Sequence, residues 1–518
     1  MSRTRPRTWL VRAAAALLAV VLLSSGCTSA VNESKQSSGA AGDTLVVGML
    51  ADLVPAAMYS QSTTSMAIGR LLYDTLIRYD HETGEPQPAV ARSWDVSRDG
   101  LTVTLKLRDD VTFHSGRPLT SEDVAYALET YASPDSGSQL QPAAAAVTSV
   151  DTSDPQVAVL KLEHPLVNLF DLLEFMLLTD RETPQELLDG TEFNGTGPFR
   201  LEEWERGQEV RLVKNDDYWN GAPEVDDVVL RVIPDQTALL NSVRSGQTNI
   251  VVDASVQALA PFEDNDDFTV EPENVWDVNY YLGANVQDPA LSDRSFRQAI
   301  ASAVDRDRIL DEVFGSTGSV NSSPWSPDSP AYDKELATRY TRDLDQAESL
   351  LARAGGAPAK PLTLAYNTGL APAKPVAEIV QNNLADIGIE VELAPFDAAA
   401  YSEYLASDEV QLWINPHGFG QNSPATLATG SAPFKPVGNL SKYESATYTQ
   451  LVQDVWEQPD PDSAEAAAAY DAYNQLLSDE QFLVNLVTTT VTNVYTGSVQ
   501  GVDWNTYKYL ILDRAAVE

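Results

Sequence analysis

Two strand–helix–strand patterns constrain the fold of this chain more than any other feature. In the first, short apolar runs predict strands at 228–233 and 249–253, and residues 234–246 between them have helical spacing with Gly246 as terminator. The second predicts strands at 362–366, 389–393 and 410–414 around a helix closed by Gly388. Strands joined by short helical crossovers pair in parallel with right-handed connections. We therefore expect at least two α/β regions with open sheets.

Open α/β sheets bind ligands beyond the carboxyl ends of their strands. In the first region those ends lead into residues 49–61 and the segment after Asp253. In the second they lead into residues 367–370, 395–397 and 415–422. Two such rims that face each other across a hinge would form a ligand-binding cleft.

The first 27 residues predict a secretory signal that ends in a lipidated cysteine. Four arginines precede an apolar run of 11 residues at 13–23, and small residues then lead to Cys27, the single cysteine of the chain. The run is shorter than the roughly 20 residues of a membrane-spanning helix. Residues 28–42 indicate a flexible tether rich in Ser, Gly and Ala. We expect an extracytoplasmic protein anchored to the outer face of the cell membrane through Cys27; the alternative is an ordinary signal peptide with an incidental cysteine.

Charge and composition exclude several classes of partner. The net charge of −41 argues against nucleic acid and against a basic membrane-binding patch. The acidic residues are scattered along the chain, which favours a solvated acidic surface over a cation-binding site. Hydrophobic residues make up 43% of the chain, and no second cysteine exists for a disulfide. Packing alone must therefore hold the fold together.

Several segments, in this order along the chain, resemble bacterial solute-binding proteins of the oligopeptide, dipeptide and nickel type, the receptors of ABC importers. They are LLYDTLIRYD at 71–80, residues 88–129 with their FH-x-G core and TSEDV helix start, NGTGPF at 194–199, SFRQAIASAVDRDRI at 295–309, LDQAESLLARAG at 344–355 and NNLADIGIEVEL at 382–393. The resemblance covers nearly the whole mature chain, which is identified as a member of extracellular solute-binding protein family 5.

The resemblance implies an α/β, periplasmic-binding-protein-like fold (type II, cluster C) with two major lobes, a hinge and an inserted third lobe. Carried over to this chain, it gives a signal peptide at 1–27, a tether at 28–42, lobe I at 43–78, 195–280 and 490–518, an inserted lobe at 79–194 and a ligand-closing lobe at 281–489. The two connections of the hinge would lie near 279–286 and 487–494. The implied protein is a monomer without cofactor that captures a peptide-like or other small solute by hinge closure and delivers it to ABC permease subunits.

Candidate ligand contacts come from the predicted rims, where aromatic side chains offer apolar area with a polar tip. They are Met58 and Tyr59 after the first strand, Trp276 before the hinge, Tyr366 and Asn367 at a strand end, and Trp413, Phe419, Gln421 and Asn422 in or beside the segment 415–424. Tyr280 and Tyr281 are neighbours on a predicted strand and point to opposite faces, so at least one of them packs in a core.

The segment 415–424 (NPHGFGQNSP) departs from the family pattern. Peptide-binding members carry Gly-Trp followed by an aspartate that pairs with the free amino terminus of the peptide. Here Gly418 and Phe419 replace Gly-Trp, and Asn422 falls about where the aspartate is expected. An amide cannot supply the charge that a buried ammonium needs, and an unpaired buried ion costs several kcal/mol. This departure weakens the case for peptides with free amino termini and leaves neutral, blocked, cyclic or sugar-like solutes compatible.

No motif supports catalysis. The four histidines lack the spacing of zinc ligands, and the chain contains no HExxH, GxSxG or P-loop motif. We expect His114 and the turn at Gly195 and Gly197 to be structural. The chain is therefore predicted not to be an enzyme and to bind no metal or cofactor; a secreted hydrolase, or a sensor or chaperone with the same binding fold, are the alternatives.

Overall fold

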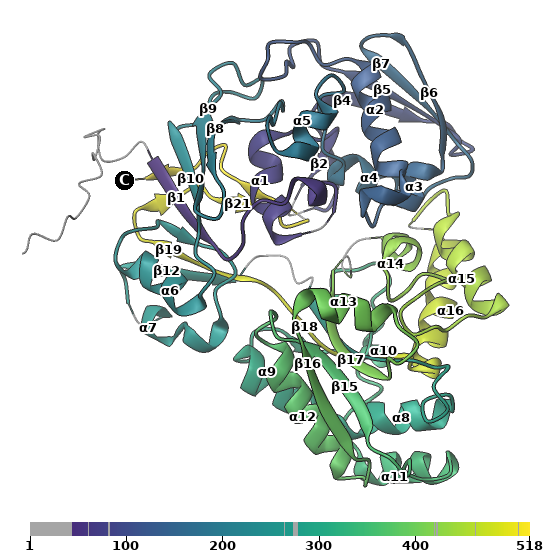
Figure 1. The fold of residues 1–518 in the computed structure, drawn as a ribbon. Coiled ribbons are helices and arrows are strands. Elements are labelled where there is room, and N and C mark those ends of the chain that lie inside the picture. Colours follow the sequence, from purple (N-terminus) through teal and green to yellow (C-terminus); the bar gives the residue numbers. More distant parts are fainter. Residues whose placement is uncertain are drawn as a thin grey trace, which may run out of the picture. The chain divides into compact units, whose positions relative to one another are not determined.

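A computed structural model describes residues 44–517, apart from 61, 81–82, 264, 273–277, 419, 421–422, 462 and 506. Within this part of the chain, three sheets have four or more strands (Figure 1). Helices cover them, and the predicted α/β class is confirmed. No helix among the described residues combines the length and the apolar character that a bilayer crossing requires.

A seven-stranded sheet has the order β12–β19–β11–β1–β10–β9–β8. Its strands are β1 (Thr44–Met49), β8 (Phe199–Glu205), β9 (Glu209–Lys214), β10 (Asp227–Val232), β11 (Ile250–Val251), β12 (Phe268–Pro272) and β19 (Thr492–Thr496). Helix α6 (Gln236–Arg244) connects β10 to β11, and both strands pair in parallel with β1. The predicted strand–helix–strand unit is confirmed. Strand β11 is shorter than expected, because Asp253 takes the left-handed conformation (φ 56°) and ends the extended backbone.

A six-stranded sheet has the order β14–β18–β13–β17–β15–β16. Its strands are β13 (Val278–Ala284), β14 (Ser319–Val320), β15 (Leu362–Asn367), β16 (Val391–Phe396), β17 (Leu412–His417) and β18 (Leu483–Thr489). Strand β15 is parallel to β16 and β17, as predicted, whereas β13 pairs antiparallel with β17 and β18. Helix α12 (Ala373–Ala385), between β15 and β16, is the helix that the second pattern predicted.

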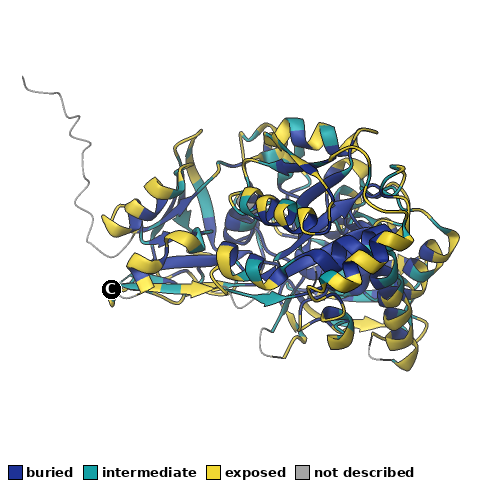
Figure 2. Ribbon diagram, turned by 90° about the horizontal axis from the view of Figure 1, so that it is seen from below, coloured by how far each residue is buried: buried dark blue, intermediate teal, exposed yellow. Residues whose placement is uncertain are grey.

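Helices cover both faces of the six-stranded sheet because side chains alternate along its strands. Leu282 and Ile414 face one core, formed with α8 (Arg294–Ala303), α9 (Arg306–Phe314), α11 (Leu344–Arg353) and α12. Tyr281 and Trp413 face the other core, formed with α13 (Ala398–Ala406), α14 (Pro424–Gly430), α15 (Ala446–Trp456) and α16 (Ala464–Glu480). Buried residues therefore concentrate in the strands, and exposed residues cover the outward helix faces (Figure 2).

A four-stranded antiparallel sheet lies, in sequence, between β1 and β8. Its strand order is β4 (Ala91–Val96), β5 (Thr102–Leu107), β7 (Val157–Leu162) and β6 (Val147–Asp154). Helix α2 (Ser121–Ala132) packs on this sheet. Helix α2 begins where the cap was predicted: the Thr120 amide donates to Asp123 Oδ2 at 2.9 Å.

Smaller elements complete the described chain. They are α1 (Thr63–Leu72), α3 (Gln141–Ala145), α4 (Leu169–Phe175), α5 (Pro184–Asp189), α7 (Ala260–Glu263), α10 (Lys334–Ala337), the strand pairs β2 (Ile77–Tyr79) with β3 (Pro86–Pro88), β20 (Val499–Gln500) with β23 (Ala516–Val517), and β21 (Asp503–Trp504) with β22 (Leu510–Ile511), and 3₁₀ turns at Pro55–Ala57, Pro134–Ser136 and Val256–Ala258.

The chain passes between the seven- and six-stranded sheets at two short connections. One follows β12, which ends at Pro272 before β13 begins at Val278, and the other joins β18, which ends at Thr489, to β19, which begins at Thr492. The second connection lies inside the range predicted for the hinge. The range predicted for the first, 279–286, lies mostly within β13, so that prediction was a few residues too late. The lobe boundaries given by the resemblance stay a prediction.

The predicted structural role of His114 and the glycine turn is confirmed. His114 Nε2 lies 3.1 Å from the Gly197 carbonyl, and its Nδ1 accepts a hydrogen bond from the Gly195 amide. A Cβ at Gly195 would lie 1.8 Å from the Leu72 carbonyl oxygen, so the close backbone approach requires glycine. Burial lowers the pKa of His114 to about 4, which keeps it neutral.

Candidate functional site

Strands β18, β13 and β17 present a row of polar side chains on the face covered by α13 to α16; we call it the polar face. Asn279 pairs in register with His417, Tyr281 with Asn415, and Gly283 with Trp413. Because alternate residues share a face, these side chains point the same way. The Trp413 indole lies directly over Gly283: a Cβ there would be 2.2 Å from Trp413 Cε2.

A hydrogen-bond chain fixes one end of the polar face. Thr488 Oγ1, on β18, donates to Asn279 Oδ1 at 2.6 Å and accepts from Asn321 Nδ2 at 2.7 Å. The same Asn321 amide also donates to the Trp325 carbonyl. These hydrogen bonds therefore orient the Asn279 side chain through its oxygen, and its NH₂ group takes no part in them.

Four members of the polar face bury atoms that form no well-aligned hydrogen bond with a described residue, although Trp413 and Asn415 lie near the Tyr281 hydroxyl and Asn485 lies near the His417 ring. The four atoms are Asn279 Nδ2, Tyr281 Oη, Trp413 Nε1 and His417 Nε2. Most buried polar atoms in proteins have a partner, so four neighbouring exceptions need an explanation. An orphaned buried group costs about 1–3 kcal/mol, and a polar ligand can supply the missing partner.

The electrostatics of the polar face are neutral. Burial lowers the pKa of His417 to about 4, so the imidazole carries no charge at neutral pH. Burial raises the pKa of Tyr281 to about 12, although the nearby Trp413 and Asn415 side chains oppose the shift. The hydroxyl therefore stays protonated. No group of three or more His, Cys, Asp or Glu that could hold a metal occurs among the described residues.

The loop after β17 approaches the polar face closely. The Gly420 carbonyl accepts a hydrogen bond from the Ser326 amide at 2.8 Å, and a Cβ at Gly420 would lie 2.5 Å from Asn279 Nδ2. Ser423, at the end of this loop, also buries an Oγ without a described partner. Gly420, which belongs to the segment that departs from the family pattern, thus lies against Asn279.

Helix α14, which follows the loop, contacts α4 beside the four-stranded sheet. Thr426 Oγ1 donates to Asp171 Oδ2 at 2.8 Å and accepts from Asn168 Nδ2 at 3.0 Å. At the other end of α14, a Cβ at Gly430 would lie 1.5 Å from the Gln139 carbonyl oxygen. Two elements far apart in the sequence are therefore packed tightly together next to the loop.

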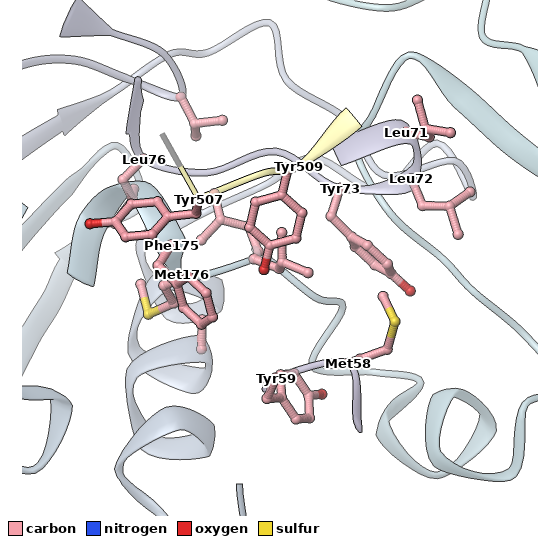
Figure 3. Close-up of a cluster of buried hydrophobic side chains, with 14 of the residues drawn as sticks. Met58, Tyr59, Leu71, Leu72, Tyr73, Leu76, Phe175, Met176, Tyr507 and Tyr509 are labelled. Atoms are coloured by element: carbon pink, nitrogen blue, oxygen red, sulfur yellow. The ribbon is translucent and has the colours of Figure 1, made fainter. Parts of the chain in front are cut away.

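Two of the predicted contact residues, Met58 and Tyr59, lie in the core near the seven-stranded sheet (Figure 3). Both are buried, and the Tyr59 ring meets the Tyr131 ring edge-on at 5.3 Å. Tyr73 and Tyr509 belong to the same cluster and bury hydroxyl groups without a described hydrogen-bond partner. A ligand contact by Met58 or Tyr59 stays a prediction.

The other candidates divide between the two faces of the six-stranded sheet. Trp413 lies on the polar face, and Asn367 at the end of β15 uses its Oδ1 to accept from the Gly369 amide at 2.9 Å. Tyr366 packs in the opposite core. Cys27, Trp276, Phe419, Gln421 and Asn422 lie outside the described residues.

Sequence reasoning missed Asn279, Tyr281 and His417 as site residues. Tyr280 packs against the Phe314 ring at 4.9 Å, as expected for one member of the tyrosine pair, and Tyr281 faces the other way. The available signal was a polar period of two, which Asn279 and Tyr281 show on an otherwise apolar strand.

Comparisons with known proteins bear on this geometry. The model for bacterial extracellular solute-binding proteins, family 5 Middle, matches residues 85–433. The chain is 28% identical over 431 residues to the oligopeptide-binding protein AppA of Bacillus subtilis, which covers 77% of this chain and 78% of AppA.

Solved structures share the fold. The periplasmic binding protein AgaA from A. tumefaciens R10, in complex with agropinic acid, has a TM-score of 0.80 at 22% identity and covers 92% of this chain and 99% of AgaA. NikZ from Campylobacter jejuni, in complex with Ni(L-His), has a TM-score of 0.78 at 20% identity and covers 90% of this chain and 97% of NikZ.

Proposed function

The chain belongs to the bacterial extracellular solute-binding proteins of family 5, and we propose that it binds a small polar solute on the polar face of β13, β17 and β18. It is a solute receptor of the ABC-transporter type, as its family membership indicates. The main support for this binding site is the set of four buried, unsatisfied hydrogen-bonding atoms on adjacent strands.

The chemistry of these atoms describes the part of the solute that they bind. Asn279 Nδ2 and Trp413 Nε1 can only donate, and Tyr281 Oη offers either role. His417 Nε2 accepts, because Nδ1 of the neutral ring donates to the Gly418 carbonyl at 3.3 Å. The residues carry no formal charge at neutral pH, so they suit carbonyl, hydroxyl or amide groups. The related proteins bind an oligopeptide, agropinic acid and a nickel–histidine complex according to their names, and each carries groups of this kind.

Capture involves closure of the two major sheets around the solute. Gly420 lies against Asn279, and α14, which follows in the chain, contacts Asp171 and Asn168. A solute that contacts the loop and the polar face together favours the arrangement in which α14 meets α4, because binding shifts the population toward the state with more contacts. The closed monomer then docks on the permease subunits of the importer.

The lipid anchor on Cys27 keeps the receptor beside that permease. Its test is membrane fractionation of cells that express the full chain or the Cys27→Ala variant. The anchored form remains with membranes, and the variant appears in the medium or the soluble extracytoplasmic fraction. Equal membrane retention of both forms would rule the anchor out.

Solute binding is tested by native mass spectrometry of residues 43–518, with release and identification of any bound small molecule. A thermal-shift panel of amino acids, dipeptides, monosaccharides and nickel–histidine complements it. Tyr281→Phe removes one unsatisfied hydroxyl, and we expect it to weaken solute binding about 2- to 10-fold.

The matched control is Tyr401→Phe, because Tyr401 Oη already donates to the Ile414 carbonyl at 2.6 Å. This variant should keep the solute affinity of the parent. A protein that binds nothing in either assay, or a Tyr281→Phe variant with unchanged affinity, would overturn the proposed site.

A further inference from the structure

A cavity of about 280 Å³ lies where β19 begins, beside the connection from the six-stranded sheet. Its apolar walls come from Leu259 and Phe262, in or next to α7, and from Phe268, Val270 and Pro272 of β12. These elements are neighbours in the part of the molecule that contains the seven-stranded sheet (Figure 1). The Phe262 and Phe268 rings meet edge-on, with their centroids 5.2 Å apart. An apolar cavity of about 150 Å³ holds benzene, so this one has room for an aromatic ring with a short side chain.

The pairing of β12 with β19 explains why these walls surround one space. Val270 pairs with Val494 and Pro272 with Thr492, and alternate residues of a strand share a face. Phe262 and Val494 belong to the same small buried core, against which Val270 packs. The cavity therefore continues this core toward the connection between the two sheets.

Thr492 contributes a hydrogen-bonding atom to the cavity wall. The residue is 4% exposed, and its Oγ1 has no hydrogen-bond partner in the described part of the chain. Thr496 lies on the same face of β19, but its Oγ1 is 3.1 Å from Ser498 Oγ. Buried hydroxyl groups in proteins usually have a partner. An occupant with a polar group at this point would supply the missing one.

Glu263 gives the cavity a negative charge. Its exposed side chain forms part of the lining, and the exposed Asp266 and Asp267 follow it in the chain. Arg244 stacks on the Phe262 ring, with Cζ 5.0 Å from the ring centroid. The three carboxylates outnumber this guanidinium, so the local charge favours a cationic occupant over an anionic one.

Thr317 contributes a wall from the other side of the connection. It lies in the loop between α9 and β14, and its carbonyl accepts a hydrogen bond from Thr489 Oγ1 at 2.7 Å. Thr489 is the last residue of β18, so this loop is tied to the six-stranded sheet. An occupant of the cavity would therefore contact both major parts of the molecule beside the short segment that joins them.

We propose that this cavity is a second binding site, and that its ligand is a small hydrophobic amine with one aromatic ring. The ring contacts the apolar walls, the Glu263 carboxylate binds the ammonium, and Thr492 Oγ1 accepts one of its N–H groups. The inference goes beyond the proposed function, because it concerns residues outside the polar face and a cationic ligand.

The experiment measures the binding of three probes of similar shape to residues 43–518 by calorimetry: phenethylamine, phenethyl alcohol and hydrocinnamate. The amine should bind with a Kd of about 0.1–1 mM, a range that suits a ligand of this size. The alcohol should bind roughly 3- to 30-fold more weakly, because it lacks the charge that Glu263 recognises. Hydrocinnamate carries the opposite charge and should bind more weakly still.

Two variants locate the amine in the cavity. Glu263→Gln should remove the preference for the amine over the alcohol and keep the affinity for the alcohol. Thr492→Val preserves the shape of the side chain but removes its hydroxyl, and should weaken amine binding about 2- to 10-fold. It should not lower the melting temperature, since no described residue loses a hydrogen bond.

Each variant has a matched control. Glu271→Gln removes an exposed carboxylate of β12 that alternates with Val270 and so points to the opposite face. Thr496→Val removes a hydroxyl from the same face of β19 outside the cavity lining. Both controls should keep the amine affinity of the parent.

Three results would overturn the inference while the proposed function stands. The first is the absence of saturable phenethylamine binding, and the second is equal affinity for the amine and the alcohol in the wild type. The third is an amine preference that survives in Glu263→Gln but disappears in Tyr281→Phe, which would place the amine on the polar face. Failure of the proposed function is a separate result, because it is measured with the solute and the polar-face variant.

Discussion

Two regions of the molecule bury polar side chains. In the network of Arg117, Asp123 and Asp180 beside the four-stranded sheet, the buried carboxylates are hydrogen-bonded; on the polar face of the six-stranded sheet, four buried atoms are not. Asp123 accepts from Arg117 at 2.6 Å, from Arg181 at 2.8 Å and from the Thr120 amide. Asp180 accepts from Arg117 and from Asn194. On the polar face, four atoms remain unsatisfied. Burial of polar groups therefore does not mark a site by itself; what distinguishes the polar face is that four atoms without a partner lie on two adjacent strands.

The largest expected effect comes from removing the shared cation of the Arg117 network. Arg117→Ala leaves Asp123 and Asp180 buried, at 0% and 4% exposure, without their shared cation. We expect a loss of about 3–5 kcal/mol in the free energy of unfolding, measured by urea titration. The control is Arg108→Ala, whose partner Asp110 is exposed, with an expected loss of at most about 1 kcal/mol. Similar losses in both variants would contradict the comparison.

Much of the architecture follows from the sequence because hydrophobic periodicity is local. The apolar stripe of Val376, Ile379 and Leu384 predicted helix α12 between two parallel strands, and Asp123, three residues after the Thr120 cap, predicted the start of α2. The site is harder to predict because it depends on register. Asn279 faces His417 only through the antiparallel pairing of β13 and β17, which joins residues 138 positions apart. No local pattern encodes such pairings.

The contact between α14 and α4 predicts a pH effect. Burial raises the pKa of Asp171 from 3.8 to about 6, against hydrogen bonds from Thr426 and Tyr79. The folded state thus retains a proton that the unfolded state loses, so this stabilisation is full below pH 3.8 and disappears as the pH rises through 6.

The test compares urea unfolding of the wild type and Asp171→Asn across this range. Relative to the variant, the wild type should gain roughly 2–3 kcal/mol between pH 7.5 and pH 4. Parallel pH profiles for the two proteins would show that Asp171 titrates normally and that the contact does not bury it as described.

A smaller effect is expected where the polar face is tightly packed. Gly283→Ala places a methyl group 2.2 Å from Trp413 Cε2, so the indole must move. We expect a loss of about 1–3 kcal/mol in stability by thermal or urea unfolding, together with weaker solute binding because Trp413 Nε1 shifts. Unchanged solute affinity despite the loss of stability would exclude Trp413 from the site.

The smallest stability effect should come from the unsatisfied group itself. Tyr281→Phe removes a hydroxyl that forms no well-aligned hydrogen bond with a described residue, so the free energy of unfolding should change by less than about 0.5 kcal/mol or rise. Tyr401→Phe breaks a made hydrogen bond and should cost about 1 kcal/mol. The reverse order of the two losses would mean that the Tyr281 hydroxyl has a structural partner.

The most direct test of the central claim is a crystal structure of residues 43–518 with the solute identified by native mass spectrometry. The account predicts polar solute atoms within about 3.2 Å of at least two of Asn279 Nδ2, Tyr281 Oη, Trp413 Nε1 and His417 Nε2. A solute bound elsewhere, with these four atoms still unpaired, would contradict it.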